Sequence, residues 1–285
     1  MSRFRLAPHF WIGLALALGF WAVNWLAGGL RTVWAFFPMW LGYALVMDAL
    51  SLRRNGTSLL TRGWKRYVGL FLVSAPAWWL FEALNARSQN WHYLGVEGFT
   101  PLEYFLLASI NFSTVMPAVF GAAEWVSGAG WVRRLGCGPL IRPDRRTTIA
   151  FFAAGWVMLA LLLVWPRYFF PFVWLSVLFI IEPVNAWLGH RSLSDYSQHG
   201  DWRPMISLWV GVLITAFFWE MWNFLSYPKW IYSVPFVDFA RVFEMPIFGY
   251  TGYLPFALEL FALYHLVVGL LCRKQSRYIQ FHAKD

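Results

Sequence analysis

The chain has 285 residues, of which 59% are hydrophobic and 13% are charged, and its mean hydropathy is +0.51. This composition excludes a soluble globular or disordered chain, because several apolar runs reach the roughly 20 residues that an α-helix needs to cross a bilayer. The alternation typical of membrane β-strands is absent, so we expect helices. The net charge of +9 fits basic loops on one side of a membrane, and we expect no nucleic-acid partner.

The apolar runs predict an all-α fold, a polytopic membrane helical bundle of about eight transmembrane helices. In chain order the expected spans are 10–29, 33–52, 66–86, 101–124, 147–166, 169–190, 204–226 and 252–272. The five basic residues at one set of span ends are Arg31, Arg87, Arg167, Lys229 and Arg241, and the other 18 of the 23 fall at the opposite ends. The positive-inside rule then predicts a multi-pass protein of a bacterial-type inner membrane, with both termini cytoplasmic.

A short acidic motif occurs twice in the chain. Glu82 is followed three residues later by Asn85, and Glu220 is followed in the same way by Asn223. A Trp-x-Tyr stretch comes shortly after each copy, first at 91–93 and then at 230–232. This ordered set of matches predicts an internal duplication.

The duplication divides the chain into a first four-helix membrane repeat, 1–140, and a second one, 141–285. Because each half holds an even number of spans, both halves enter the membrane in the same direction and form parallel repeats. The external loops 87–100 and 227–251 are too apolar for free loops and too interrupted for spans. We expect both to be re-entrant or interfacial segments that cap the outer half of the bundle.

Four glutamates are the candidate catalytic residues. Ionisable groups inside a bilayer are costly, so they indicate function by default. The span directions place Glu82, Glu220, Glu103 and Glu259 in the outer half, where we expect them to converge on one cavity. A carboxyl group buried in an apolar cavity can keep its proton, as a general acid must. Glu244, in the second external loop, is a candidate substrate-binding residue.

The remaining candidate substrate-binding residues lie next to these acids. Asn85 and Asn223 are placed to orient the glutamate one helical turn away. The aromatic candidates are Trp79, Trp91, Tyr93, Trp219, Trp222, Trp230 and Tyr232. Aromatic faces stabilise cations, so this lining suits a carbocation intermediate, and it suits a bound lipid or polyene equally well. We therefore expect a membrane lipid or isoprenoid substrate, and neither a metal nor a cofactor, because diphosphate-metal and haem motifs are absent.

Three other interpretations stay open at this stage. The duplicated glutamates can be a structural clamp between helices. A proton or solute transporter explains the same acids, and it predicts a polar route that continues to Asp48 or Glu182. We expect those two acids, beside Arg53, Arg54 and Arg191, to pair with them or to face water. The third is a non-catalytic subunit of a membrane complex, and a homo-oligomer is also compatible with the sequence.

The motifs resemble those of the integral-membrane lycopene cyclase domains of the heterodimeric bacterial and fused fungal type. In the first half Phe81-Glu82, Trp91-His92-Tyr93 and Pro101-Leu102-Glu103-Tyr104 are similar in order and spacing. In the second half Trp219-Glu220 and Trp230-Ile231-Tyr232 are similar. The chain departs from that pattern where Tyr104, rather than a second acid, follows Glu103, and in being longer.

That resemblance covers roughly residues 70–120 and 210–260. It implies a duplicated, all-helical and cofactor-free fold. It also implies a reaction in which an acid protonates the terminal double bond of a linear carotenoid. The resulting cation closes a ring and then loses a proton, without net oxidation or reduction.

Overall fold

The computed structural model describes residues 6–27, 32–272 and 276–281. Arg31 and the last two residues of the first expected span lie outside these ranges. Within them, eight segments are long and apolar enough to cross a membrane. Exposed apolar side chains such as Leu72, Leu106 and Val157 cover the outer surface of the helices. A lipid environment suits such a surface, and the expected eight-span membrane bundle is confirmed at this level.

The eight segments follow the expected order, and several have internal breaks. Five segments are single helices: Pro8–Leu26 (α1), Val33–Asn55 (α2), Trp64–Ser88 (α3), Arg145–Val164 (α7) and Arg203–Phe224 (α11). The segment Pro101–Ser127 consists of α4 (Pro101–Phe112) and α5 (Val115–Ser127), and the segment Pro166–Trp187 consists of α8 (Pro166–Phe169), η1 (Phe170–Trp174) and most of α9 (Ser176–Leu188). The last segment, Ile247–Cys272, consists of η2 (Ile247–Gly252) and α12 (Tyr253–Cys272). Two single-turn helices, Gly130–Arg133 (α6) and Ser194–Ser197 (α10), lie in the connections.

The expected fourth span is broken in its middle, between α4 and α5. Ser74 of α3 stabilises the break, because its Oγ donates to the Phe112 carbonyl at 2.7 Å and accepts from the Met116 N–H at 3.1 Å. A serine from a neighbouring helix thereby satisfies backbone groups that a break exposes in an apolar environment. Hydropathy alone did not indicate this break.

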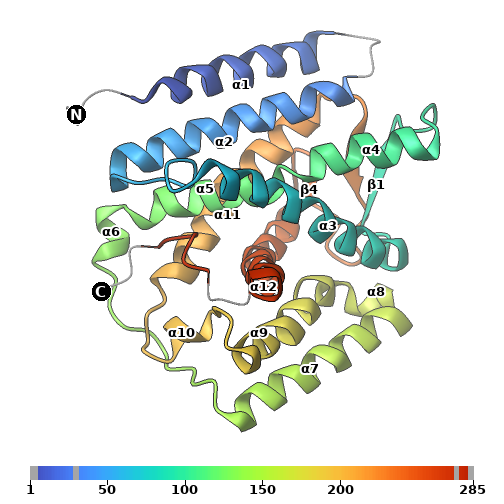
Figure 1. Cartoon of the computed structure of the whole chain (residues 1–285). Coiled ribbons are helices and arrows are strands. Elements are labelled where there is room, and N and C mark those ends of the chain that lie inside the picture. Colours follow the sequence, from blue (N-terminus) through green and yellow to red (C-terminus); the bar gives the residue numbers. More distant parts are fainter. Residues whose placement is uncertain (1–5, 28–31, 273–275, 282–285) are drawn as a thin grey trace.

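The helices form a layered bundle (Figure 1). In that view α1 and α2 lie at one edge, α7 and α9 lie at the opposite edge, and α5, α11 and α12 lie between them. Glycines allow the closest approaches. A Cβ on Gly42 of α2 would lie 2.5 Å from the Ala17 backbone nitrogen of α1, and a Cβ on Gly211 of α11 would lie 2.5 Å from that of Ala123 in α5. Small residues are the usual means of close helix packing in membranes.

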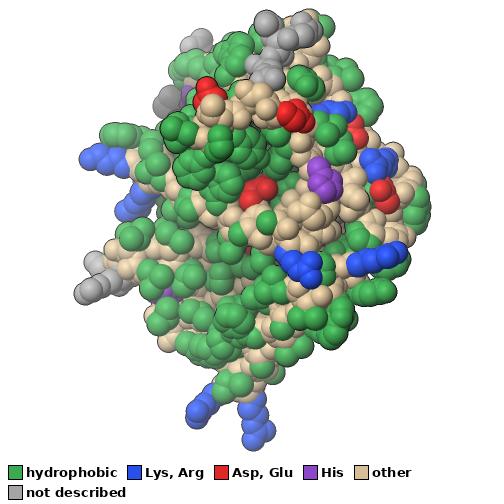
Figure 2. Space-filling model, turned by 90° about the vertical axis from the view of Figure 1, so that its right-hand side faces the viewer, with side chains coloured by type: hydrophobic (Ala, Val, Ile, Leu, Met, Phe, Trp, Pro, Cys, Tyr) green, Lys and Arg blue, Asp and Glu red, His purple; other side chains and the backbone are tan. Residues whose placement is uncertain are grey.

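The two external loops meet in a short antiparallel ribbon. Trp91–Leu94 (β1) pairs with Lys229–Tyr232 (β2), so that Trp91 lies opposite Tyr232 and Tyr93 lies opposite Trp230. Two-residue strands, Arg241–Val242 (β3) and Met245–Pro246 (β4), form a second small pair. We call this end of the bundle the ribbon face. Figure 2 looks onto it and shows broad hydrophobic areas with scattered charged side chains.

The opposite end, which we call the tail face, is covered by residues 276–281. Tyr278 and Ile279 of this segment are buried. The Arg62 guanidinium donates to the Tyr278 carbonyl at 2.9 Å, and that of Arg191 donates to the Ile279 carbonyl at 2.5 Å. The Tyr278 hydroxyl donates to the Leu59 carbonyl at 2.6 Å. The tail therefore holds the two halves of the chain together at this end.

The acids of the tail face have other partners than expected. Asp48 accepts from the Ser58 hydroxyl and the Leu60 N–H, both at 2.8 Å, and lies 3.2 Å from His9. Glu182 accepts from the Ser194 N–H at 3.1 Å. The expected pairing with nearby arginines is therefore not observed. Each carboxyl group instead holds the loop that follows its own helix.

Candidate functional site

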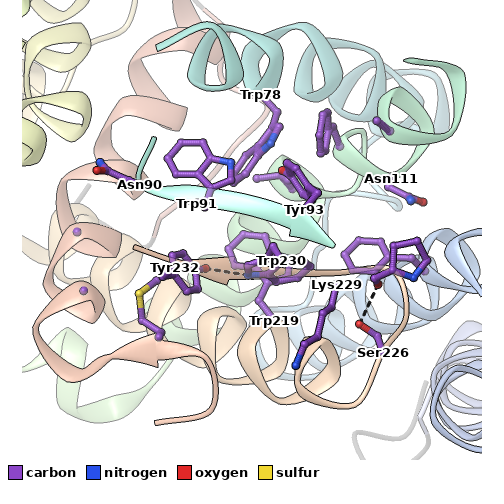
Figure 3. Close-up of a pocket in the computed structure, with 18 of the residues that line it drawn as sticks. Trp78, Asn90, Trp91, Tyr93, Asn111, Trp219, Ser226, Lys229, Trp230 and Tyr232 are labelled. Carbon is purple, nitrogen blue, oxygen red and sulfur yellow. Dashed lines mark hydrogen bonds between the residues drawn. The ribbon is translucent and has the colours of Figure 1, made fainter. Parts of the chain in front are cut away.

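A cavity of about 360 Å³ lies beneath the ribbon. Its wall is mostly aromatic and apolar, and Figure 3 shows how side chains from both strands point into it. Five of the expected substrate-binding residues line it: Trp91, Tyr93, Trp219, Trp230 and Tyr232. The ribbon thus brings the two copies of the motif, which are far apart in sequence, to one site.

Glu82 lies behind this aromatic wall. Its Oε1 accepts three hydrogen bonds, from the indole N–H groups of Trp78 at 2.8 Å and Trp91 at 3.1 Å and from the Tyr93 hydroxyl at 2.5 Å. All three donors line the cavity, whereas the glutamate does not. The carboxyl group is therefore linked to the cavity through one phenol and two indoles.

Glu220 has a related environment in the second half. Its Oε1 accepts from the Tyr232 hydroxyl at 2.7 Å and from the Tyr253 hydroxyl at 2.6 Å. Trp230 extends the chain by donating to the Tyr232 oxygen at 2.8 Å. Glu220 is fully buried, and its Oε2 has no partner among the described residues. A buried, unpaired carboxyl oxygen is costly unless it carries a proton or meets a ligand.

The two asparagines of the motif make equivalent contacts. Asn85 accepts from the Trp91 N–H at 3.2 Å and donates to the Trp91 carbonyl at 2.8 Å. Asn223 accepts from the Trp230 N–H at 2.9 Å and donates to the Trp230 carbonyl at 2.7 Å. Each asparagine therefore fixes the start of the Trp-x-Tyr stretch to the end of its own helix, rather than contacting its glutamate.

The two ribbon tyrosines keep their protons over a wide pH range. Burial and the neighbouring Glu82 carboxyl group raise the pKa of Tyr93 well above its usual 10.0. Burial, Glu220 and Tyr253 do the same for the pKa of Tyr232. Both phenols therefore act as hydrogen-bond donors at neutral pH.

None of the four candidate catalytic glutamates lines the cavity itself. Contrary to the expected convergence, Glu103 and Glu259 also make no hydrogen bond to the described tyrosines of its lining, and Glu244, a candidate substrate-binding residue, does not line it either. Glu103 is exposed and forms a capping box with Thr100 at the start of α4. Glu259 is fully buried, and it accepts from the Leu178 N–H at 3.3 Å. Glu244 forms an ion pair with Lys229. Their carboxyl groups make local contacts, for a helix cap, a helix contact and a loop contact.

Two of the expected aromatic residues also lie away from the cavity wall. Trp79 donates to the Ser109 hydroxyl at 2.9 Å and stacks on Phe105, with ring centroids 5.2 Å apart. Trp222 packs against Trp40, with ring centroids 4.9 Å apart. Both face neighbouring helices, because successive helix positions point in different directions.

Three residues of the site are not among the predicted catalytic or substrate-binding residues. Trp78 donates to Glu82, Tyr253 donates to Glu220, and Trp174 stacks on Trp91 with ring centroids 5.8 Å apart. Trp78 precedes its glutamate by four residues, a spacing that places both on one helix face and was available as a signal. Nothing in the sequence around Tyr253 or Trp174 indicates their partners.

No group of three or more His, Cys, Asp or Glu residues suited to a metal ion occurs in the described part of the chain. Comparison with protein-family models, curated proteins and solved structures finds no match among any of the three.

Proposed function

We propose that this membrane protein binds one end of a long apolar molecule of the isoprenoid class in the aromatic cavity, and that the glutamates supply acid–base chemistry for a non-redox cyclisation. The observation that carries the proposal is the pair of carboxyl–tyrosine contacts at Glu82 and Glu220, joined by the ribbon that covers the cavity. A volume of about 360 Å³ encloses only part of a long polyene and leaves the rest in the membrane.

The proposed reaction uses tyrosine as a proton relay. A phenol, Tyr232 or Tyr253, gives its proton to a terminal double bond and takes a proton from the Glu220 carboxyl group. The aromatic wall stabilises the carbocation while a second double bond closes the ring. The ring cation then loses a proton through Tyr93 to Glu82. The substrate gains one proton and loses one, so its atoms and electrons balance. Loss of the proton from Glu82 to water and uptake of one by Glu220 then restore the starting state.

The proposal includes the internal duplication of the chain and the orientation of the bundle in the membrane. Support for parallel repeats 1–140 and 141–285 comes from corresponding helix contacts. In the two repeats α1 corresponds to α7, α2 to α9, α3 to α11 and α5 to α12. The contact of α1 with α2 then matches that of α7 with α9, and the contact of α2 with α5 matches that of α9 with α12. Between the repeats, the contact of α3 with α12 matches that of α11 with α5. The charge distribution supports an orientation with the ribbon face outside the cell and both termini in the cytoplasm.

Expression in a lycopene-producing bacterial host tests whether the protein cyclises the end of a linear carotenoid. We expect the wild type to yield ringed carotenoids, and Glu220→Gln and Glu82→Gln to lower the yield by about 100-fold, the usual contribution of an acid or base. Glu103→Gln, an exposed capping residue, is the control and should retain the yield. Absence of ringed products with the wild type refutes cyclisation. Mass spectrometry of co-purifying pigments and lipids then tests binding alone.

A purely structural role is the second candidate, and the asparagine contacts favour it. In that case Glu82 only orders Trp78, Trp91 and Tyr93 around it. The role predicts that neutralising both glutamates lowers stability without changing which lipids co-purify. A shift in the co-purifying lipids with unchanged stability contradicts it.

A further inference from the structure

The cavity is aromatic at the Trp91 end, where Asn90 is a polar lining residue whose Oδ1 has no partner among the described residues, and polar side chains gather at the other end. Its polar lining residues include Thr32, Asn111, Ser226 and Lys229. Figure 3 shows Asn111, Ser226 and Lys229 on the side away from Tyr232 and Trp91. An amphipathic wall of this kind is typical of pockets in which a few polar groups orient an otherwise apolar ligand.

The contacts of these residues place them at one junction. Thr32 donates its hydroxyl to Asn24 at 2.8 Å and its N–H to the Tyr227 carbonyl at 3.1 Å. The Asn111 amide donates to the Val33 carbonyl at 3.3 Å. The start of α2, the C-terminal half of α4 and the turn between α11 and β2 therefore meet at this end.

Among the described residues, this end offers hydrogen-bond acceptors with little net charge. Asn111 uses its amide N–H on Val33, and its Oδ1 accepts from no group in the described ranges. The Ser226 hydroxyl donates to the Asn223 carbonyl at 2.9 Å, which leaves its oxygen able to accept. Lys229 is the one charged residue of the lining within the described ranges, and it forms an ion pair with Glu244. Such a site favours an uncharged hydrogen-bond donor over an anion.

From this arrangement we infer that the ligand is an isoprenoid alcohol, whose hydroxyl donates to Asn111 while its hydrocarbon chain points towards the aromatic end. This inference rests on the proposed function, and it adds that a ligand with a neutral hydroxyl group is preferred over a pure hydrocarbon, which the same cavity still binds more weakly. A phosphate ester is disfavoured, because it would have to compete with Glu244 for Lys229.

Native mass spectrometry of the detergent-solubilised full chain tests the inference. The protein is mixed with equimolar geranylgeraniol, the same hydrocarbon without the hydroxyl, and geranylgeranyl phosphate. We expect the alcohol adduct to exceed the hydrocarbon adduct about fivefold, the ratio that one net hydrogen bond supplies. In Asn111→Leu this ratio should fall to about one while the hydrocarbon adduct remains. The control Ser113→Ala, two residues away, should keep the wild-type ratio.

The outcomes separate this inference from the proposed function. Equal binding of alcohol and hydrocarbon overturns the inference and leaves apolar binding in place. Preferential binding of the phosphate also overturns the inference. So does a loss of the preference for the alcohol in Asn90→Leu instead of Asn111→Leu, because Asn90 lies at the other end of the cavity (Figure 3). Binding of none of the three removes both proposals. If Asn111→Leu does not fold, Ser226→Ala supplies the test, with an expected twofold loss of preference or more.

Discussion

Replacing Asn85 by leucine tests how the end of α3 holds the ribbon. The Asn85 side chain makes three hydrogen bonds, accepting from the Asn90 N–H at 2.8 Å and the Trp91 N–H at 3.2 Å and donating to the Trp91 carbonyl at 2.8 Å. Leucine has a similar volume and satisfies none of them. Asn90 and Trp91 are buried, so water does not readily replace the amide. Each lost partner costs about 1–3 kcal/mol, and we expect a total loss of about 3–5 kcal/mol.

Two other asparagines give a graded series for this prediction. Asn223 makes two bonds to the half-buried Trp230, so Asn223→Leu should cost about 2–3 kcal/mol. Asn55, at the end of α2, donates one bond to the Glu124 carbonyl at 2.8 Å, so Asn55→Leu should cost about 1 kcal/mol. The assay is reversible unfolding in mixed micelles, titrated with dodecyl sulfate and followed by tryptophan fluorescence. Equal losses for all three variants would refute the reasoning, because the cost would then not follow the number of bonds.

The remaining predictions use the same unfolding assay. Gly211→Ala should lower the free energy of unfolding by about 1–3 kcal/mol, because the new Cβ would lie 2.5 Å from the Ala123 nitrogen. Gly19→Ala, with open space around the new Cβ, should raise the free energy of unfolding by up to about 1 kcal/mol. Arg62→Met should lower the free energy of unfolding by about 3 kcal/mol, because it leaves the buried Glu124 without its ion pair and the Tyr278 carbonyl without its donor. Adding Glu124→Gln should recover the part of the loss that comes from the unpaired carboxyl group. Because the pKa of Tyr93 is raised in the folded state, its contribution to stability is complete below about pH 10 and falls as the pH rises further. Tyr93→Phe should remove that part of the alkaline loss.

Each of these predictions has a contradicting result. Equal stability of Gly211→Ala and Gly19→Ala would mean that α5 and α11 are not in close contact. If the double variant with Arg62→Met and Glu124→Gln is as unstable as Arg62→Met alone, the unpaired Glu124 carboxyl group is not the cause of the lost stability. An absorbance titration at 295 nm in which every tyrosine ionises near pH 10 would contradict the raised pKa of Tyr93.

Much of the bundle could be predicted because hydropathy is a local property of the chain. A helix needs a fixed number of apolar residues to cross the hydrocarbon core, so the eight spans appear in any sliding window. The pairing of Glu82 with Asn85, and of Glu220 with Asn223, is also local, because the spacing is visible without knowing the fold. The break after Phe112 was not predictable in this way, since the stabilising hydroxyl belongs to Ser74 on another helix.

The candidate site was predicted in part, and the limit has a physical cause. The sequence indicated that Trp91, Tyr93, Trp230 and Tyr232 belong with the acids. The spacing of Thr100 and Glu103 is itself a signal that Glu103 caps its own helix. The burial of Glu220 under two phenols had no such signal, because the direction of a side chain depends on which helices surround it.

By itself, the sequence determined that this chain crosses the membrane repeatedly and carries one acidic motif twice. Those properties follow from composition and short spacings. Only the tertiary structure decided that the two Trp-x-Tyr stretches pair as one ribbon, and that Tyr253 reaches Glu220 across 33 residues. The path of the chain sets such contacts, because hydrogen bonds between distant segments require both backbones to be held in place by the packing of the whole bundle.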